Sequence, residues 1–399
     1  MIMNVKNLFL TASVALASFL PITASADDWM ADINDAAFVY QLSIPGAHDA
    51  ATGHGTSADS FARTQEANLS EQWATGVRAF DLRPTVSGSN VNINHGIVST
   101  KIDFRTAMFL LRDSVIAHPT EFAIVMMRHE DDNESNEEKA AWPKLVGEIL
   151  ADESLAPYII PFARNLTVSE MRGKILVLTR NTFDGAKGGV ITGWSHSKNL
   201  ADQKNAKITQ ARGTTQATLY CQDFYDVSAS GAVADKKAAV SNLLAYSVKQ
   251  HTRSNYIWII NHTSGYSKTF FGIASVDGYR DNAATQNAAV IEYLKDESHW
   301  GPTGIIVMDF AGRDSSGGYS VMGKSLTRAI IENNSRYTPK MSALVGIEEV
   351  GEENMTEANG AALGSEVYTL DGRRVSGTAK GGLFIVSNGK GGAKKVLVP

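Results

Sequence analysis

The sequence predicts an α/β protein in which parallel strands alternate with helices. Short apolar runs without polar alternation, typical of strands buried on both faces, occur at 122–127, 175–178, 256–260 and 305–310. Segments with helical periodicity lie between or beside these runs, at 66–75, 103–117, 135–150, 234–250, 282–294 and 322–332. Six or more such units in one domain favour a (β/α) barrel, and a doubly wound open sheet is the alternative.

The first 26 residues have the features of an export signal. Lys6 precedes an apolar run from Leu8 to Leu20, and Ala24-Ser25-Ala26 provides a small-residue cleavage site. A retained membrane anchor would need about 20 apolar residues, more than this run contains. We therefore expect the mature protein to work outside the cytoplasm, as a periplasmic, surface-attached or secreted protein.

Composition and charge exclude several classes of protein. The chain is 43% hydrophobic and 20% charged, which is the balance of a chain that folds. Its net charge of −5 and the absence of a long Lys/Arg block argue against nucleic-acid binding. A single cysteine, Cys221, excludes an intramolecular disulfide and a Cys-based zinc finger. Residues 318–325 match the G-x-x-x-x-G-K-S phosphate loop, but no strand ends directly before them, so we expect a loop that enters a helix.

The character of the chain changes after about residue 340. Residues 341–364 are rich in Glu, Gly and Ala and are expected to form a linker. In 365–399, the segments 366–370 and 374–375 flank an Asp371-Gly372 turn, and 383–386 and 395–398 flank a Gly-rich stretch. We expect a small C-terminal all-β module used for sorting or attachment, which leaves 27–340 as the main domain.

Polar side chains follow several of the predicted strands at the point where each strand ends. They are His48, Asp49, Asp81, Arg83, His95, Arg128, Arg180 and Asp309. Because the carboxyl ends of barrel strands share one rim, we expect these side chains to surround one site. Asp223 and Tyr225 stand two residues apart and can also face one ligand. Any one of these residues alone is more often a solvated residue or a structural ion-pair partner.

Two histidines, an arginine and carboxylates are groups that suit phosphoryl transfer without a metal. A neutral His can take a proton from an attacking hydroxyl, a protonated His can give one to the leaving oxygen, and Arg can hold the phosphate oxygens. Each imidazole needs a carboxylate to fix its tautomer, and Asp309 and Asp49 are the candidates.

Three ordered motifs resemble the X region of bacterial phosphatidylinositol-specific phospholipase C. They are Ser43-Ile44-Pro45-Gly46-Ala47-His48-Asp49, Gly76-Val77-Arg78-Ala79-Phe80-Asp81-Leu82-Arg83 and Asn94-His95-Gly96. The resemblance covers residues 30–335 and implies a distorted (β/α)8 TIM-type barrel. It also implies a phosphatidylinositol diacylglycerol-lyase, in which the inositol 2-hydroxyl attacks phosphorus, diacylglycerol leaves, and myo-inositol 1,2-cyclic phosphate remains.

The resemblance implies a role for each residue of the two acid–base pairs. His48 would be the general base, oriented by Asp309. His95 would be the general acid, supported by Asp49. A catalytically idle inositol-lipid or glycan binding protein on the same barrel is the alternative.

The resemblance further implies that Arg83 binds the phosphate, with Asp81 in the same cluster. Relatives that use calcium hold the ion near the position of Arg83, where a guanidinium would take its place and supply its charge. We therefore expect no metal and no other cofactor. The acidic run 130–134 lacks the spacing of a calcium loop and is expected to be a solvated loop.

The family's inositol pocket maps onto Arg180, Asp223 and Tyr225, and Arg128 stands where a Lys is expected. The expected partner is phosphatidylinositol in membrane surfaces, with glycosyl-phosphatidylinositol anchors as further substrates. The tryptophans expected on the rim after the first His are absent. An aromatic patch of Tyr266, Phe270, Phe271 and Tyr279 could replace them, with ordinary loop packing as the alternative. The remaining histidines, including His196 and His262, are expected to be structural or exposed.

Overall fold

The computed structural model describes residues 26–185, 187–250, 256–344, 366–369, 382–387 and 393–398. Nine strands close into a barrel in the order β6-β2-β1-β15-β12-β11-β10-β9-β8, with β8 paired back to β6. A further strand, β7 (Ile159–Ile160), pairs with β8. The barrel strands are β1 (Ser43–Ala47), β2 (Ala79–Leu82), β6 (Ala123–Met127), β8 (Ile175–Thr179), β9 (Gly189–Thr192), β10 (Ala206–Gln210), β11 (Gln216–Gln222), β12 (Ile257–His262) and β15 (Gly304–Met308).

The barrel forms because its strands carry apolar side chains on both faces. Every residue of β1, β2, β6, β8 and β15 is buried. In β6, Ile124 and Met126 belong to one apolar cluster, and Val125 and Met127 belong to the other, which also contains side chains of the surrounding helices. Successive residues of a strand point to opposite faces, so the first cluster fills the barrel and the second packs the helices onto it.

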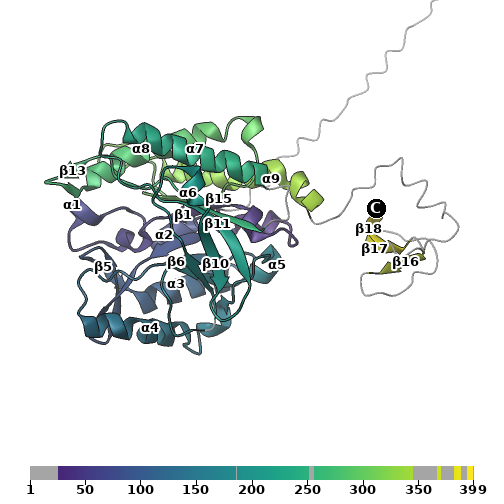
Figure 1. Ribbon diagram of the computed structural model, residues 1–399, viewed down its shortest axis with the longest axis horizontal. Coiled ribbons are helices and arrows are strands. Elements are labelled where there is room, and N and C mark those ends of the chain that lie inside the picture. Colours follow the sequence, from purple (N-terminus) through teal and green to yellow (C-terminus); the bar gives the residue numbers. More distant parts are fainter. Residues whose placement is uncertain are drawn as a thin grey trace, which may run out of the picture.

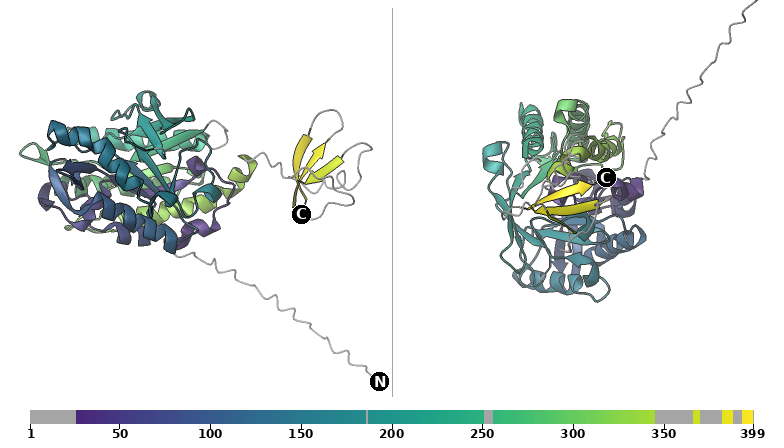
Figure 2. Two further views of the ribbon diagram at one scale, coloured as in Figure 1. Left: turned by 90° about the horizontal axis from the view of Figure 1, so that it is seen from below. Right: turned by 90° about the vertical axis from the view of Figure 1, so that its right-hand side faces the viewer.

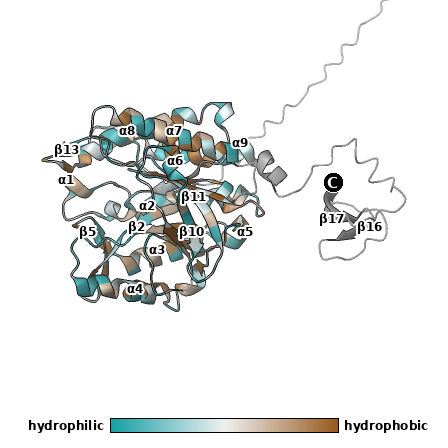
Figure 3. Cartoon of the chain, in the orientation of Figure 1, coloured by the Kyte–Doolittle hydropathy of each residue, from teal (hydrophilic) through white to brown (hydrophobic). Residues whose placement is uncertain are grey.

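Helices cover the outside of the barrel. Helices α7, α8 and α9 lie together on one side, and α3 and α4 lie on the opposite side (Figures 1 and 2). Each mixes hydrophobic and hydrophilic residues (Figure 3), as expected for a helix with one packed face and one solvated face. The α-helices are α1 (Asp59–Ala62), α2 (Leu69–Ala74), α3 (Phe104–Ala117), α4 (Asn136–Leu150), α5 (Val168–Met171), α6 (Leu200–Gln203), α7 (Ala232–Gln250), α8 (Val276–Tyr293) and α9 (Gly323–Leu344). Short 3₁₀ helices are η1 (Ala26–Asp32), η2 (Val39–Gln41), η3 (Ala50–His54), η4 (Ala156–Tyr158) and η5 (Glu297–His299).

The starts of the long helices follow from local sequence. The Asp103 side chain accepts a hydrogen bond from the Thr106 N–H at the start of α3. Ser135 and Glu138 form a reciprocal capping box at the start of α4. The Ser325 N–H in the first turn of α9 donates to Asp314 Oδ1 at 2.7 Å. The run that matches a phosphate loop therefore enters a helix whose first turn is already bonded to a carboxylate of the chain, as expected from its context.

The predicted parallel (β/α)8 arrangement is wrong in strand number and in the direction of one strand. Strand β10 is antiparallel to both neighbours, β9 and β11. Residues 211–215 alone connect β10 to β11, and such a connection is too short for a crossover between parallel strands. A closed barrel of mainly parallel strands is confirmed, and the open sheet is excluded.

An antiparallel sheet inserted after β2 carries one of the predicted site residues. It consists of β3 (Pro84–Ser87), β4 (Asn90–His95) and β5 (Val98–Asp103). His95 is the last residue of β4, so it does not stand on a barrel strand as the strand-end argument assumed. A smaller hairpin, β13 (Thr269–Phe270) and β14 (Ile273–Ala274), precedes α8.

The predicted terminal segments are described only in part. Residues 1–25 of the predicted export signal and 345–364 of the predicted linker lie outside the described residues. The linker was expected to begin at residue 341, but α9 extends to Leu344. Strands β16 (Glu366–Thr369), β17 (Gly382–Ser387) and β18 (Ala393–Val398) pair antiparallel in that order. The expected pairing of 366–370 with 374–375 is not the observed one, because β16 pairs with β17. Within the described residues, no helix is both long and apolar enough to cross a bilayer.

Candidate active site

A cavity of about 360 Å³ opens at the carboxyl ends of the barrel strands, and we call it the mouth. Its walls are built by residues that follow β1, β2, β6, β8 and β11, together with the end of β4 and the segment around β14. The lining residues are His48, Arg83, His95, Gly96, Arg128, Glu130, Asp132, Arg180, His196, Asp223, Tyr225, Gly265, Tyr266, Ala274 and Tyr279.

His48 is held between a buried carboxylate and the mouth. Its Nδ1 lies 2.7 Å from Oδ1 of Asp309, which has no exposed surface. The other carboxylate oxygen of Asp309 accepts the Gly265 N–H at 3.0 Å, so both oxygens are engaged. Burial lowers the pKa of His48, but the carboxylates of Asp49 and Asp309 outweigh it and raise the pKa to about 9. The imidazole is therefore a strong base with a fixed orientation.

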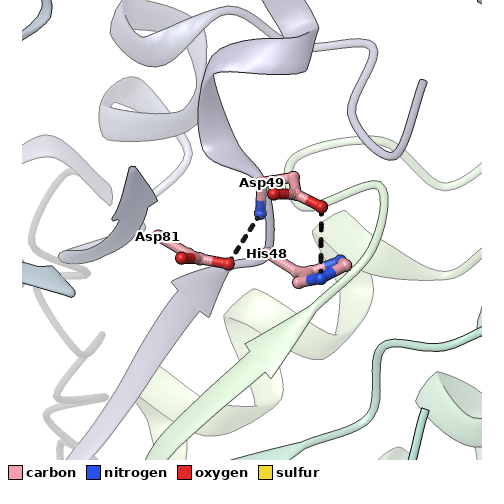
Figure 4. Close-up of side chains that lie close together, drawn as sticks. All are labelled: His48, Asp49 and Asp81. Carbon is pink, nitrogen blue, oxygen red and sulfur yellow. Dashed lines mark hydrogen bonds and ion pairs between the residues drawn. The ribbon is translucent and has the colours of Figure 1, made fainter. Parts of the chain in front are cut away.

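Asp49 lies between the two predicted catalytic histidines. Its carboxylate is 3.3 Å from His48 Nε2 and 3.5 Å from His95 Nε2. The residue has a left-handed backbone, with φ of 42°, which Asp tolerates better than most residues. Its N–H donates to Asp81 Oδ2 at 3.2 Å, and Figure 4 shows this bond beside the His48–Asp49 pair. Burial raises the pKa of Asp49, but Arg83 and the two histidines lower it to about 2, so the carboxylate is charged.

Arg83 connects the carboxylates of this side of the mouth. Its Nε lies 2.6 Å from Asp49 Oδ1, and one terminal nitrogen lies 3.2 Å from Asp81 Oδ2 and 3.0 Å from His48 Nε2. Burial lowers the pKa of Arg83, but the surrounding carboxylates raise it well above the ordinary arginine value. The guanidinium is thus a permanent cation at the centre of the cluster.

Three groups here have the geometry of potential metal ligands. One ligand atom each from His48, Asp49 and Asp81 lie within 4.8 Å of one another. The Arg83 guanidinium contacts all three, so these groups already share a cation that belongs to the chain. A metal ion bound by the three groups would have to displace that guanidinium.

Glu130 forms an ion pair with Arg83. The expectation that the acidic run is a solvated loop is wrong for this residue. The side chain is 3% exposed, with Oε2 at 3.8 Å from Arg83 and 3.6 Å from Arg128. Its other oxygen accepts the Gly96 N–H at 2.9 Å. Glu134 of the same run is also buried, 2.7 Å from His129. The run is therefore divided: the side chains of Glu130 and Glu134 are buried, whereas Asp132 and Asn133 are exposed as expected.

His95 completes the cluster from the inserted sheet. Its Nδ1 lies 2.8 Å from the Ala62 carbonyl oxygen, which can only accept, so Nδ1 carries the proton of the neutral ring. Its Nε2 then faces Asp49, and the His95 ring centroid is 6.4 Å from that of His48. The two imidazoles and the guanidinium of Arg83 therefore border one volume in the mouth.

The opposite wall of the mouth is built around Asp223. Its carboxylate accepts the Trp194 Nε1–H at 2.9 Å and lies 3.3 Å from His196 and 3.6 Å from His262. Burial raises the pKa of Asp223, but the contacts with these imidazoles and with the indole lower it well below the ordinary value. Arg180 stacks on the Trp194 ring, with 4.5 Å from its guanidinium carbon to the ring centroid.

All ten residues predicted for the site meet at the mouth or directly behind it. They are His48, Asp49, Asp81, Arg83, His95, Arg128, Arg180, Asp223, Tyr225 and Asp309. Sequence reasoning missed Glu130 and Trp194 and treated His196 and His262 as structural or exposed. A sequence signal was available for Trp194, which follows β9 as the other site residues follow their strands.

Two of the four residues of the predicted aromatic patch are exposed. Phe270 and Phe271 are 56% and 90% exposed, but Tyr279 is 4% exposed and lines the mouth. Tyr266 is half-buried between Tyr225 and Tyr279. Ile273, 59% exposed, joins the two phenylalanines at the tip of the β13–β14 hairpin.

No family model matches the chain, but individual proteins do. A protein of Staphylococcus aureus (strain Newman) named 1-phosphatidylinositol phosphodiesterase is 24% identical over 305 residues, which are 73% of this chain and 90% of the relative. This chain is therefore similar in sequence to bacterial proteins that carry this name. The Listeria monocytogenes protein of the same name is 26% identical over 164 residues, 40% of this chain and 50% of that relative.

Solved structures of phosphatidylinositol-specific phospholipase C share the fold. One from S. aureus has a TM-score of 0.62 at 20% identity and covers 78% of this chain and 98% of its own. The L. monocytogenes enzyme has a TM-score of 0.56 at 23% identity and covers 78% and 99%. The resemblance to phosphatidylinositol-specific phospholipase C stated from the sequence is confirmed, and so is the TIM-like barrel.

Proposed function

We propose that this protein is a phosphatidylinositol diacylglycerol-lyase that cleaves phosphatidylinositol to diacylglycerol and myo-inositol 1,2-cyclic phosphate. The observation that carries the proposal is the convergence of His48, His95 and Arg83 on one volume of the mouth. Two imidazoles and a guanidinium that border one volume can act as a base, an acid and a phosphate ligand.

The reaction is an exchange of two phosphorus–oxygen bonds. The 2-hydroxyl oxygen of inositol attacks phosphorus while its proton passes to Nε2 of His48. The bond from phosphorus to the diacylglycerol oxygen breaks, and this oxygen takes a proton from Nε2 of His95. The nucleophile and the phosphate belong to the same ring, so the attack is intramolecular and gains the entropic advantage of proximity. Water can later open the cyclic phosphate, with His95 as the base that takes the proton of water and His48 as the acid that returns a proton to the 2-hydroxyl oxygen.

Buried carboxylates set the direction of both proton transfers. Asp309, 2.7 Å from His48 Nδ1, stabilises the imidazolium that forms when His48 takes the proton. Asp49 places its carboxylate 3.5 Å from His95 Nε2, the nitrogen that gives up the proton, and can hold the ring in position. Arg83 balances the negative charge that grows on the phosphate oxygens.

We propose that the reaction needs no metal ion. The charge that a divalent ion would supply is provided by Arg83, whose guanidinium contacts His48, Asp49 and Asp81, the groups with metal-ligand spacing. Arg128, which shares Glu130 with Arg83, adds a second cation beside the phosphate position.

The opposite wall supplies the headgroup selection. Arg180 and Asp223 carry charged hydrogen-bonding groups, and Tyr225, 44% exposed, offers a ring face to a sugar-like ring. Hydroxyl groups of inositol satisfy these donors and acceptors, whereas choline has no ring hydroxyls to do so.

The β13–β14 hairpin is proposed to contact the membrane. Its exposed Phe270, Phe271 and Ile273 stand next to the mouth, which Ala274 and Tyr266 line. Phe61 of α1 adds to the patch, with its ring centroid 6.3 Å from that of Phe270. An apolar tip beside a lipid-cleaving site fits peripheral binding to a bilayer surface. One of the S. aureus structures concerns membrane binding by that enzyme. Together with the predicted export signal, the patch supports action on membranes outside the cytoplasm.

A vesicle assay tests the proposed function. The full chain is incubated with vesicles of phosphatidylinositol or of phosphatidylcholine in EDTA, and diacylglycerol is measured. Release from phosphatidylinositol alone is expected, and release of anchored proteins by the same preparation would extend the substrate to glycosyl-phosphatidylinositol. Binding to phosphatidylinositol vesicles without diacylglycerol would contradict the lyase and favour an inositol-lipid binding protein.

A further inference from the structure

His262 is a buried histidine beside the mouth, and the proposed reaction gives it no role. It is the last residue of β12, and its side chain is 3% exposed. Its ring packs edge-on against His48 at 6.0 Å and against Trp194 at 5.6 Å between centroids. It therefore stands between the wall that carries the general base and the wall built around Asp223.

The surroundings of His262 keep its ring neutral. Nδ1 lies 3.0 Å from the Ser264 hydroxyl and 3.6 Å from Asp223 Oδ1. Burial lowers the pKa of His262, and the nearby positive charges of His48 and Lys236 oppose the influence of Asp223, so the pKa falls to about 3. A neutral imidazole has one N–H donor and one acceptor nitrogen. Because a carboxylate only accepts, the tautomer with the proton on Nδ1 fits these neighbours, which leaves Nε2 as an acceptor.

Nε2 of His262 is buried and has no hydrogen-bond partner among the residues that the structure describes. His262 borders a small space of about 10 Å³ below the mouth, enough for one water-sized group. Arg83, Arg180 and Asp223 line both this space and the mouth, so the two lie side by side. A buried acceptor without a donor is costly, and a ligand hydroxyl that reaches it removes that cost.

We propose that His262 is a specificity-determining residue whose Nε2 accepts a hydrogen bond from one ring hydroxyl of the substrate. The inference rests on the proposed function, because it assumes a polyol headgroup in the mouth. The hydroxyl concerned is not the attacking one, whose proton passes to His48. A site built to bond a hydroxyl rejects an analogue that lacks it, so His262 would help to separate inositol from less hydroxylated headgroups.

A cycle of variants and substrate analogues tests the assignment. The kcat/KM of the wild type and of His262→Phe is measured on phosphatidylinositol and on analogues that lack the ring hydroxyl at position 3, 4, 5 or 6. The wild type is expected to lose about tenfold or more on one analogue, and His262→Phe is expected to show no further loss on that same analogue. An equal loss of His262→Phe relative to wild type on every substrate would overturn the proposal and indicate a packing role.

Two controls separate His262 from its neighbours and from folding. His196→Phe removes the other imidazole at Asp223. This variant is expected to keep the wild-type loss of kcat/KM on the analogue that lacks the hydroxyl bound by His262. Nitrogen-15 NMR of the wild-type imidazoles needs no variant: added myo-inositol is expected to shift the Nε2 resonance of His262. No shift under saturating myo-inositol would contradict the hydrogen bond. A wild type that cleaves no phosphatidylinositol would remove the proposed reaction but would leave this binding measurement intact.

Discussion

The two walls of the mouth are built from different chemistry. On the wall that follows β1 and β2, Arg83 lies within 4 Å of three carboxylates, and the charged groups are all paired within the chain. On the wall that follows β9, β11 and β12, one carboxylate, Asp223, is surrounded by an indole and two imidazoles. The first wall is a fixed field of charges, and the second is a set of directional hydrogen-bonding groups.

The difference assigns different parts of the reaction to the two walls. Charges that are fixed before the substrate arrives stabilise negative charge that develops on phosphate without reorganisation. Directional hydrogen-bonding groups, charged or neutral, recognise the positions of hydroxyls. Changes on the first wall should therefore reduce kcat, and changes on the second should alter selectivity among headgroups.

Removal of either imidazole of the first wall has the largest expected effect. His48→Ala and His95→Ala should each lower kcat on phosphatidylinositol by about 10²–10⁴-fold, the range that one acid–base group supplies. Replacing diacylglycerol by a nitrophenol leaving group should restore most of the activity of His95→Ala, because such an oxygen needs no proton. The same substrate should leave His48→Ala inactive, and recovery of both variants would show that the two roles are assigned wrongly.

Asp309→Asn should have a smaller effect on kcat and a distinct effect on pH dependence. The carboxylate raises the pKa of His48 to about 9, so kcat/KM should increase with pH up to that value, as His48 loses its proton. Without the Asp309 charge the pKa of His48 falls, and the acidic limb of the profile should move to lower pH while kcat falls by about 10²-fold.

Asp309→Asn should also change how the free energy of unfolding depends on pH. His48 has a higher pKa when folded than the ordinary 6.5, so its contribution to stability is present below that pH and is lost as pH rises to about 9. Asp309→Asn should reduce this loss. Asp314→Asn is the matched control for the pH profile, because it removes a carboxylate at the start of α9. If this variant shifted the kcat/KM profile as Asp309→Asn does, the role of Asp309 in setting the pKa of His48 would be contradicted.

Changes at the β13–β14 hairpin should leave both walls intact. Phe271 has a φ of 50° and is 90% exposed, and Asn tolerates such a backbone better than most residues. A Phe side chain gains about 1.5–3 kcal/mol on leaving water, so Phe271→Asn should weaken binding to vesicles by about tenfold or more. Hydrolysis of soluble inositol 1,2-cyclic phosphate should be unchanged. Ile116→Asn, at an exposed apolar residue of α3, should change neither property, and an equal loss of vesicle binding there would contradict a specific contact.

Much of the first wall could be predicted from sequence because several of its residues follow an apolar run. His48 and Arg128 come directly after β1 and β6, Arg83 follows β2, and parallel strands bring such positions to one rim. The barrel itself was predictable because unbroken apolar runs indicate strands that are buried on both faces. Strands β10 and β11 were missed because exposed residues interrupt their buried positions, as in Lys207 and Thr218.

The second wall was harder to predict because its contacts join distant segments. His262 and Trp194 contact Asp223 only in the closed barrel. Neither residue has a carboxylate nearby in the sequence at a spacing that would predict the contact. Glu130 was hidden in an acidic run of the kind that is usually solvated, and its burial depends on the Gly96 N–H of the inserted sheet. Local sequence patterns do not predict that a charged side chain will be buried beside partners from distant segments.

Phosphorus-31 NMR of the reaction mixture separates the cyclic phosphate from the open inositol phosphate. The wild-type chain is added to phosphatidylinositol vesicles in excess EDTA, and the first phosphorus-containing product is followed with time. Formation of myo-inositol 1,2-cyclic phosphate before any inositol 1-phosphate is the predicted result. A reaction that stops on chelation and returns with added calcium, or one whose first product is the open monophosphate, would contradict an acid–base pair working around Arg83.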